Sequence, residues 1–170
     1  EETTTGDVES DTSAADNIAT DTDVAVVATT TITPNAPHPS AGPGQMVIEE
    51  DSGANVLDIT ASTSAGSEFA SLVIDNVPDA PSGWTVDITG LNVDGAVATQ
   101  VGNVVTVDFS GYTGDPLNYA GTLSLTPPAD TDVDWGTLTS TVTVVDADGD
   151  TATDTGTIDV VVDANADAVD

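Results

Sequence analysis

The sequence predicts an all-β protein in which short strands form a sandwich or a barrel. β-branched segments recur at intervals of about 8–12 residues, and separators rich in Gly, Pro, Asn and Asp interrupt them. No segment combines helix-forming residues with the apolar period of a helix. Hydrophobic residues make up 38% of the chain and aromatic residues 4%, which is enough for a thin core with few large side chains.

The strands are expected in the following order. The first lies within residues 23–34, where Val and Thr dominate, and the Pro-rich stretch 34–45 forms a linker or a long crossing loop. Further strands are expected at 46–50, 54–60, 67–77, 84–89, 96–101, 103–109, 119–127, 136–146 and 155–163. Residues 1–20 are acidic, rich in Thr and Ser, and predict no regular structure.

These segments divide the chain into two parts. Residues 1–45 are interpreted as an acidic N-terminal segment with one strand and a Pro-rich linker, and residues 46–170 as a β-sandwich domain. The stretch 21–39 resembles the stretch 148–169 in its Asp-x-Asp start and its Thr/Val strand. The first strand therefore belongs to a preceding repeat, to this domain or to a neighbouring subunit, unless the biased composition alone explains the similarity.

The net charge of the chain is −30 at pH 7, because it contains 30 Asp and Glu residues, no Lys or Arg, and a single His that is counted as neutral. Two carboxylates about 4 Å apart repel each other by about 1 kcal/mol even in water, so monovalent salt, a basic partner or divalent cations must neutralise them. Nucleic acid is excluded as a partner, because no positive side chain meets the phosphates. No apolar run approaches the roughly 20 residues of a membrane span, so membrane insertion is not expected. The absence of Cys excludes disulfides.

Acidic residues gather in four clusters at the ends of predicted strands. The clusters are Glu49, Glu50 and Asp51; Asp130, Asp132 and Asp134; Asp146, Asp148 and Asp150; and Asp163, Asn165 and Asp167. They offer only hard oxygen ligands, which favours Ca²⁺ over zinc or copper. Asp is also common in solvated turns, so each cluster alone has that simpler interpretation. Halophilic solvation is a further interpretation of the overall acidity.

Two segments carry a resemblance to a known family. IEEDSGANVLDIT and the long stretch from Asn118 to Asp167 are similar to the cadherin-like or VCBS-type immunoglobulin-fold repeats of large adhesins that bacteria export by type I secretion. The resemblance covers residues 45–170 and implies an immunoglobulin/cadherin-like antiparallel β-sandwich with an additional N-terminal strand. It also implies Ca²⁺ ligands in three of the clusters: Glu49, Glu50, Asp51, Asp146, Asp148, Asp150, Asp163, Asn165 and Asp167. The segment before residue 45 departs from the family pattern.

The sequence predicts a non-catalytic, calcium-stabilised structural or adhesive module of a bacterial surface or secreted adhesin. His38 lies in the Pro-rich linker, and no Ser-His-Asp arrangement can be assembled. Neighbouring domains or subunits of the same kind are the expected partners, and the expected location is extracellular or at the cell surface. The start at Glu1, without Met or a signal sequence, is typical of a processed product or an excised segment.

Two other functions stay open. One is a self-assembling filament or surface-layer subunit, in which residues 23–34 are donated as a strand to the next subunit. The other is a ligand-binding module for a glycan or another surface ligand.

Overall fold

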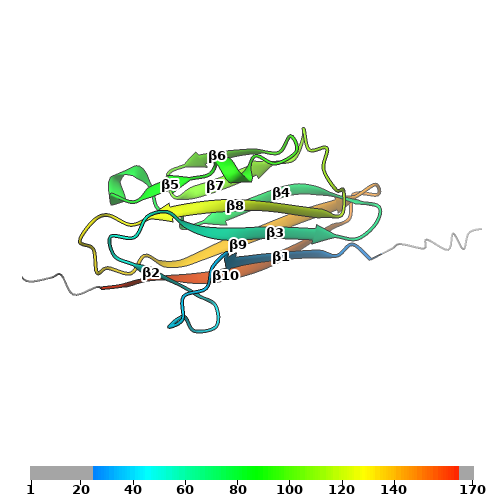
Figure 1. The fold of residues 1–170 in the computed structure, drawn as a ribbon. Helices are drawn as coiled ribbons and strands as arrows, with labels where there is room; N and C mark the ends of the chain where they lie inside the picture. Colours follow the sequence, from blue (N-terminus) through cyan, green and yellow to red (C-terminus); the bar gives the residue numbers. More distant parts are fainter. Residues whose placement is uncertain (1–24, 165–170) are drawn as a thin grey trace, which may run out of the picture.

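Two β-sheets packed face to face form an elongated sandwich in the computed structural model, which describes residues 25–164 (Figure 1). The 4-stranded sheet has the order β1-β3-β8-β5, and the 6-stranded sheet has the order β2-β10-β9-β4-β7-β6. The strands are β1 Ala28–Pro34, β2 Gln45–Glu49, β3 Asn55–Thr63, β4 Ser67–Asp75, β5 Thr85–Asp87, β6 Val97–Val101, β7 Val104–Asp108, β8 Asn118–Thr126, β9 Gly136–Asp146 and β10 Thr151–Asp163. Two single-turn 3₁₀ helices, η2 Ala80–Ser82 and η3 Thr89–Leu91, flank β5.

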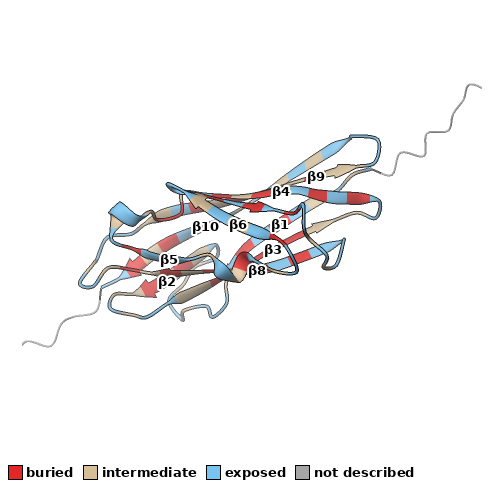
Figure 2. Ribbon diagram, turned by 90° about the horizontal axis from the view of Figure 1, so that it is seen from above, coloured by how far each residue is buried: buried red, intermediate tan, exposed pale blue. Residues whose placement is uncertain are grey.

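The core lies between the sheets because each long strand alternates apolar and polar residues. In β8, Tyr119, Leu123 and Leu125 point inward and are buried, while the residues between them are more exposed. The same alternation runs through the other central strands, so the buried positions form bands along the ribbon (Figure 2). Trp84 is buried, and the partly buried Trp135 packs against the core. One apolar face per sheet thus meets the other, as a β-sandwich requires.

The strand order is that of an immunoglobulin-like sandwich. Every pair is antiparallel except β2 with β10, which run parallel from the pair Gln45–Asp159 to the pair Glu49–Asp163. The predicted antiparallel β-sandwich is thus confirmed, and this one parallel pair is a detail that the sequence does not predict. Residues 35–44 carry the chain from β1 in one sheet to β2 in the other, and β2 then runs alongside the last strand.

The predicted strands are found at their expected places, with ends that differ by a few residues. β10 begins at Thr151 and not at residue 155, because Thr151–Gly156 pair with β9. The first strand begins at Ala28, and residues 25–27 precede it without strand geometry. It pairs antiparallel with β3 over its whole length. The interpretation of residues 1–20 concerns a part of the chain outside the described residues.

The side of the sandwich where β1 meets β10 is closed by side chains, because these two strands do not share a ladder. The backbone N–H of Thr30 donates to Oδ2 of Asp154 at 2.8 Å, and the buried hydroxyls of Thr30 and Ser140 lie 3.3 Å apart. A side chain at Gly156 would meet Thr30 O and Ser140 Oγ, each at 3.1 Å. We call this contact between Thr30, Ser140, Asp154 and Gly156 the lateral seam.

The two ends of the sandwich carry different connections. The proximal end, where β1 begins, holds the turns 63–67 and 146–151 and the loop 109–117. The distal end, where β10 finishes, holds the turn 50–54 and the loop 127–135. The described chain therefore enters the sandwich at one end and leaves it at the other (Figure 1).

Candidate functional site

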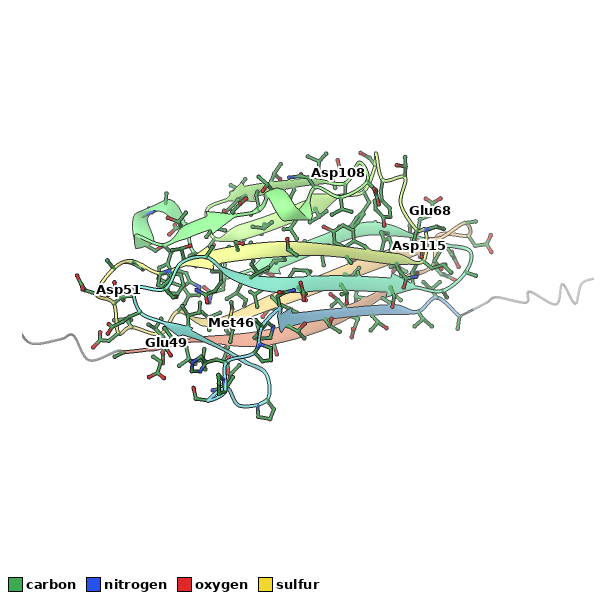
Figure 3. The ribbon with its side chains drawn as sticks, viewed as in Figure 1. Met46, Glu49, Asp51, Glu68, Asp108 and Asp115 are labelled. Atoms are coloured by element: carbon green, nitrogen blue, oxygen red, sulfur yellow. The ribbon has the colours of Figure 1, made fainter. Side chains whose placement is uncertain are left out.

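Two of the four predicted acidic clusters, together with Asp163 of a third, lie at the distal end. β2 and β10 both finish there, so Glu49 stands beside Asp163 in the parallel pair. Asp51 follows in the adjoining turn, and Figure 3 places Glu49 and Asp51 at this end of the molecule. The loop 127–135 brings the cluster of Asp130, Asp132 and Asp134 to the same end. Asn165 and Asp167 lie outside the described residues.

Backbone hydrogen bonds occupy several of these carboxylates. Oδ1 of Asp51 accepts the backbone N–H of Asp130 at 3.1 Å, and Oδ1 of Asp134 accepts that of Val162 at 2.9 Å. Asp51 and Asp130 both have positive φ values, 56° and 55°, which Asp tolerates better than most residues. The backbone N–H of Glu50 also donates to the carbonyl of Asp163 at 3.1 Å. These bonds join the turn after β2, the loop before β9 and the end of β10.

Glu49 faces the linker that precedes its own strand. Nε2 of His38 lies 2.9 Å from Oε1 of Glu49, and Nδ1 lies 2.7 Å from Oγ of Ser40. His38 thus ties the loop 35–44 to the end of β2. Both of its ring nitrogens are engaged, and we see no arrangement around it that resembles a catalytic group within the described residues.

The fourth cluster lies at the opposite, proximal end. Oδ1 of Asp146 accepts the backbone N–H groups of Asp148 at 3.0 Å and Asp150 at 2.9 Å, which closes the turn between β9 and β10. Gly149 has a φ of 93°, a value that favours glycine. The side chains of Asp148 and Asp150 are exposed. Asp146 therefore stabilises a turn, and the sequence predicts that role as well as it predicts metal binding.

The described carboxylates do not form a complete calcium site. Within residues 25–164 no three His, Cys, Asp or Glu side chains gather closely enough to hold a metal ion. Ca²⁺ takes about 6–8 oxygen ligands, so the described protein groups do not supply its coordination shell by themselves. The predicted ligand set, which includes Asn165 and Asp167, stays a prediction.

A depression at the proximal end was not predicted from the sequence. Its volume is about 520 Å³, and we call it the aromatic pocket. Side chains of β4, β7, β9 and the loop 109–117 line it, among them Glu68, Phe69, Asp108, Phe109, Tyr112 and Val145. Figure 3 shows Glu68 and Asp115 at this end and Asp108 on the neighbouring strand. Three of the four Phe and Tyr residues lie within residues 109–119, a concentration that could have indicated the site.

Aromatic contacts hold the walls of the pocket in place. All the Phe and Tyr residues of the chain form one cluster, with ring centroids 5.1 Å apart for Phe69–Phe109 and 5.6 Å apart for Phe109–Tyr112. The hydroxyl of Tyr112 donates to the carbonyl of Asn118 at 2.8 Å, and the buried Tyr119 hydroxyl donates to that of Leu91 at 2.7 Å. Both hydrogen bonds help to fix the orientation of these rings.

The charged side chains that line the pocket, Glu68 and Asp108, are both acidic. The backbone N–H of Ser110 donates to Asp108, and the hydrogen bonds from Ser110 lower the pKa of this carboxyl group. Burial, with the nearby charges of Asp94 and Asp115, raises the pKa of Tyr112. The phenol therefore stays neutral and the carboxylate stays charged at physiological pH.

A second, more open hollow of about 820 Å³ lies over β5 and the edge strand β6. Pro78, Pro81, Trp84 and Gln100 contribute to its walls. The indole of Trp84 meets that of Trp135 edge to face, with ring centroids 5.8 Å apart. Nε2 of Gln100 donates to the carbonyls of Pro78 and Gly102, so its polar head is already occupied.

Comparison with known proteins supports the fold. The major pilin subunit BcpA of Bacillus cereus is 14% identical, with a TM-score of 0.52; the match covers 80% of this chain and 40% of that chain. This chain thus spans less than half of the pilin it matches. A non-cellulosomal cohesin from the hyperthermophilic archaeon Archaeoglobus fulgidus is 12% identical over 78% of this chain and 91% of that chain. Its TM-score is 0.40, which is too low to support a conclusion about the fold.

The sequence matches no protein-family model and no curated protein. The chain is thus an all-β, immunoglobulin-like sandwich, while the adhesin-repeat family stays a prediction. Among the described residues, no helix is both long and apolar enough to span a membrane.

Proposed function

We propose that this chain is a non-catalytic, load-bearing module of an extracellular or cell-surface protein, joined end to end with neighbours of the same kind. The observation that supports this function is the placement of β1 and β10, whose outer ends lie at opposite ends of the sandwich. A module of this kind extends a chain of domains instead of folding it back.

The pairing of these two strands suits tension along the molecule. Pulling at the start of β1 shears it against β3, with which it pairs from Ala28 to Pro34. Pulling at the end of β10 shears it against β9 on one side and β2 on the other. Because the hydrogen bonds of a ladder run across the strands, such a load strains many of them together.

Single-molecule pulling tests this function. The chain has no Cys, so Ala25→Cys with Ala164→Cys gives unique attachment points at opposite ends of the sandwich. The matched control uses Ala25→Cys with Ala147→Cys, which places both attachment points at the proximal end and peels the strands apart. We expect a clearly higher unfolding force in the first geometry, and equal forces in the two geometries would contradict the proposal.

Calcium binding at the distal end is the finer part of the proposal. It is supported by the acidic residues that the turn 50–54, the loop 127–135 and the end of β10 bring to this end, and by the absence of any Lys or Arg in the chain to neutralise them. An extracellular calcium site at tenfold its dissociation constant adds about 1.4 kcal/mol of stability. That corresponds to about 3–6 °C in melting temperature for a domain of this size.

The calcium proposal is tested by thermal unfolding in a few millimolar CaCl₂, in EDTA, and in NaCl of matched ionic strength. We expect CaCl₂ to raise the melting temperature above the matched NaCl sample. Coincident melts in CaCl₂ and NaCl would remove calcium from the proposed function and leave the load-bearing role untouched.

A second candidate function is a filament subunit that exchanges β1 with the next copy. β1 is an edge strand whose only ladder partner is β3, and residues 35–44, with three prolines, connect it to the rest of the sandwich. A neighbouring copy would supply the same contacts, so exchange needs no new interface.

A disulfide between β1 and β3 distinguishes the two arrangements. Thr31 stands opposite Thr60, and their hydroxyl oxygens lie 2.7 Å apart. In the double variant Thr31→Cys, Thr60→Cys, oxidation gives a cross-linked monomer if β1 stays in its own sandwich. A ladder of covalent oligomers on non-reducing gels would identify strand exchange.

A further inference from the structure

We infer that the aromatic pocket binds an arginine side chain of a partner protein, and that this partner is not a second copy of this chain. The pocket combines aromatic rings, apolar walls and two carboxylates in one depression of about 520 Å³. The inference is independent of the load-bearing role, which depends on the strand ends.

The pocket matches the parts of an arginine side chain. Val145 and Pro116 offer apolar surface to the aliphatic stem, in the way that such stems pack on apolar residues. The partly exposed ring of Tyr112 offers a face for a guanidinium group, which stacks on aromatic rings more readily than an ammonium group does. Glu68 and Asp108 line the same depression and supply the negative charge.

The pocket is formed before any ligand arrives. Phe69 and Phe109 are buried with only 8% and 7% of their surfaces exposed, and Tyr112 is fixed by its hydrogen bond to Asn118. The carboxylate of Asp108 is oriented by the backbone N–H of Ser110 at 2.8 Å. Because these groups are already ordered, binding loses little conformational entropy.

Charge complementarity identifies the occupant and excludes a copy of this chain. Glu68 and Asp108 find no Lys or Arg partner in this chain, because its 170 residues contain none. A second copy carries the same net charge of −30 and cannot supply a guanidinium group. The complement must therefore come from a molecule of different composition.

The test uses the intact chain in about 0.15 M NaCl, where the screening length is about 8 Å and distant carboxylates contribute little. The probe is the peptide acetyl-Gly-Arg-Gly-amide, followed by NMR of the aromatic and backbone signals. The control peptide replaces Arg with citrulline, which has nearly the same shape and no charge. We expect saturable shifts at Phe69, Phe109 and Tyr112 with the Arg peptide and much smaller shifts with citrulline.

Variants separate this site from general attraction to an acidic protein. Glu68→Gln and Asp108→Asn should each weaken binding about two- to fivefold, and Tyr112→Leu by a similar factor. Tyr112→Phe keeps the ring and loses only the hydrogen bond to Asn118, so it should weaken binding less than Tyr112→Leu does. Asp75→Asn removes the same charge from an exposed position of β4 outside the pocket and should have no effect.

Three outcomes would overturn the inference. The first is the absence of saturable binding by the Arg peptide, and the second is equal binding of the citrulline peptide. The third is equal weakening by Asp75→Asn and by the pocket variants, which would mean that only the overall charge attracts the probe.

Discussion

Carboxylates in this protein act as acceptors for backbone N–H groups. Asp146 closes the turn between β9 and β10, while Asp51 and Asp134 reach groups far away in the sequence. Hydrogen bonds to a charged acceptor are stronger than neutral ones, and no Lys or Arg of the chain competes for these oxygens. The acidic composition is therefore compatible with ordered loops.

Replacing Asp134 should show how much such a bond contributes. Asp134→Ala leaves the partly buried N–H of Val162 without its acceptor, and we expect a loss of about 1–3 kcal/mol in the free energy of unfolding. Asp132→Ala removes a neighbouring exposed carboxylate and should stay within about 0.5 kcal/mol of the parent. Urea titrations in EDTA measure both. A loss seen only with calcium present would assign Asp134 to metal binding instead.

The carboxylate of Asp115 predicts a pH dependence. Hydrogen bonds from the Asn118 side chain and the Leu117 backbone lower the pKa of this group. A lowered pKa stabilises the fold above the unfolded value of about 3.9 and loses that contribution as the pH falls through the folded value. Asp115→Asn should thus be less stable than the parent at pH 7, with the difference shrinking below about pH 4. Parallel denaturation curves between pH 7 and pH 2 measure this difference, and a constant gap would contradict it.

At the residue scale, the sequence predicts the local bonds and misses the distant ones. Asp146 and Gly149 lie three residues apart, between two predicted strands. Asp and Gly at such positions are typical of a tight turn, so the sequence predicts the turn at 146–151. The bonds from Asp51 to Asp130 and from Asp134 to Val162 depend on which loops meet at the distal end. That information comes only from the strand order, which composition and spacing do not specify.

Among the elements, β1 is the strand whose attachment most needs explanation. It pairs with β3 in a ladder and contacts β10 without a ladder, at the lateral seam. The seam is polar and partly buried, and the lack of a side chain at Gly156 lets the two strands approach. Side chains thus close this side of the sandwich where the backbone does not.

A methyl group at Gly156 should weaken the seam. Its Cβ would lie 3.1 Å from both Thr30 O and Ser140 Oγ, so Gly156→Ala forces β1 outward at a cost of about 1–3 kcal/mol. Gly53→Ala is the matched control, because a Cβ there meets nothing within 4 Å. Chemical denaturation compares the two variants, and hydrogen exchange should show faster exchange in β1 of Gly156→Ala. Equal free energies of unfolding for the two variants would mean that β1 can move away from Gly156 without loss of stability.

At the element scale, the sequence predicts where every strand lies but not which strands pair. Alternating patterns such as that of β9 mark a strand with one buried face, and its predicted range of 136–146 is confirmed. The parallel pairing of β2 with β10 was missed, because a short strand carries no signal for the direction of its neighbour. The aromatic pocket was missed for the same reason, since it needs β4, β7 and β9 side by side.

For the whole molecule, the net charge of −30 opposes the compact state. The chain contains no Lys or Arg and a single His, so it has almost no positive charge of its own to offset the carboxylates. Screening by salt should therefore matter more here than in a protein with mixed charges.

We expect the melting temperature to rise steadily with NaCl. The screening length falls from about 10 Å at 0.1 M to about 3 Å at 1 M, which removes repulsion between the ends of neighbouring strands. Scanning calorimetry between these concentrations measures the trend. A flat profile would indicate that the carboxylates are too well separated to repel, and would remove the physical reason for a bound cation.

The separation of the aromatic residues gives the protein two built-in optical reporters. Both indoles, Trp84 and Trp135, sit together, and all phenol rings belong to the cluster around Phe109 at the proximal end. Selective excitation of indole fluorescence follows one region, while the tyrosine bands of second-derivative absorbance spectra, which separate phenol from indole, follow the other. Melting curves recorded at the two wavelengths will superimpose if the sandwich unravels in a single step, and will diverge if one extremity opens first.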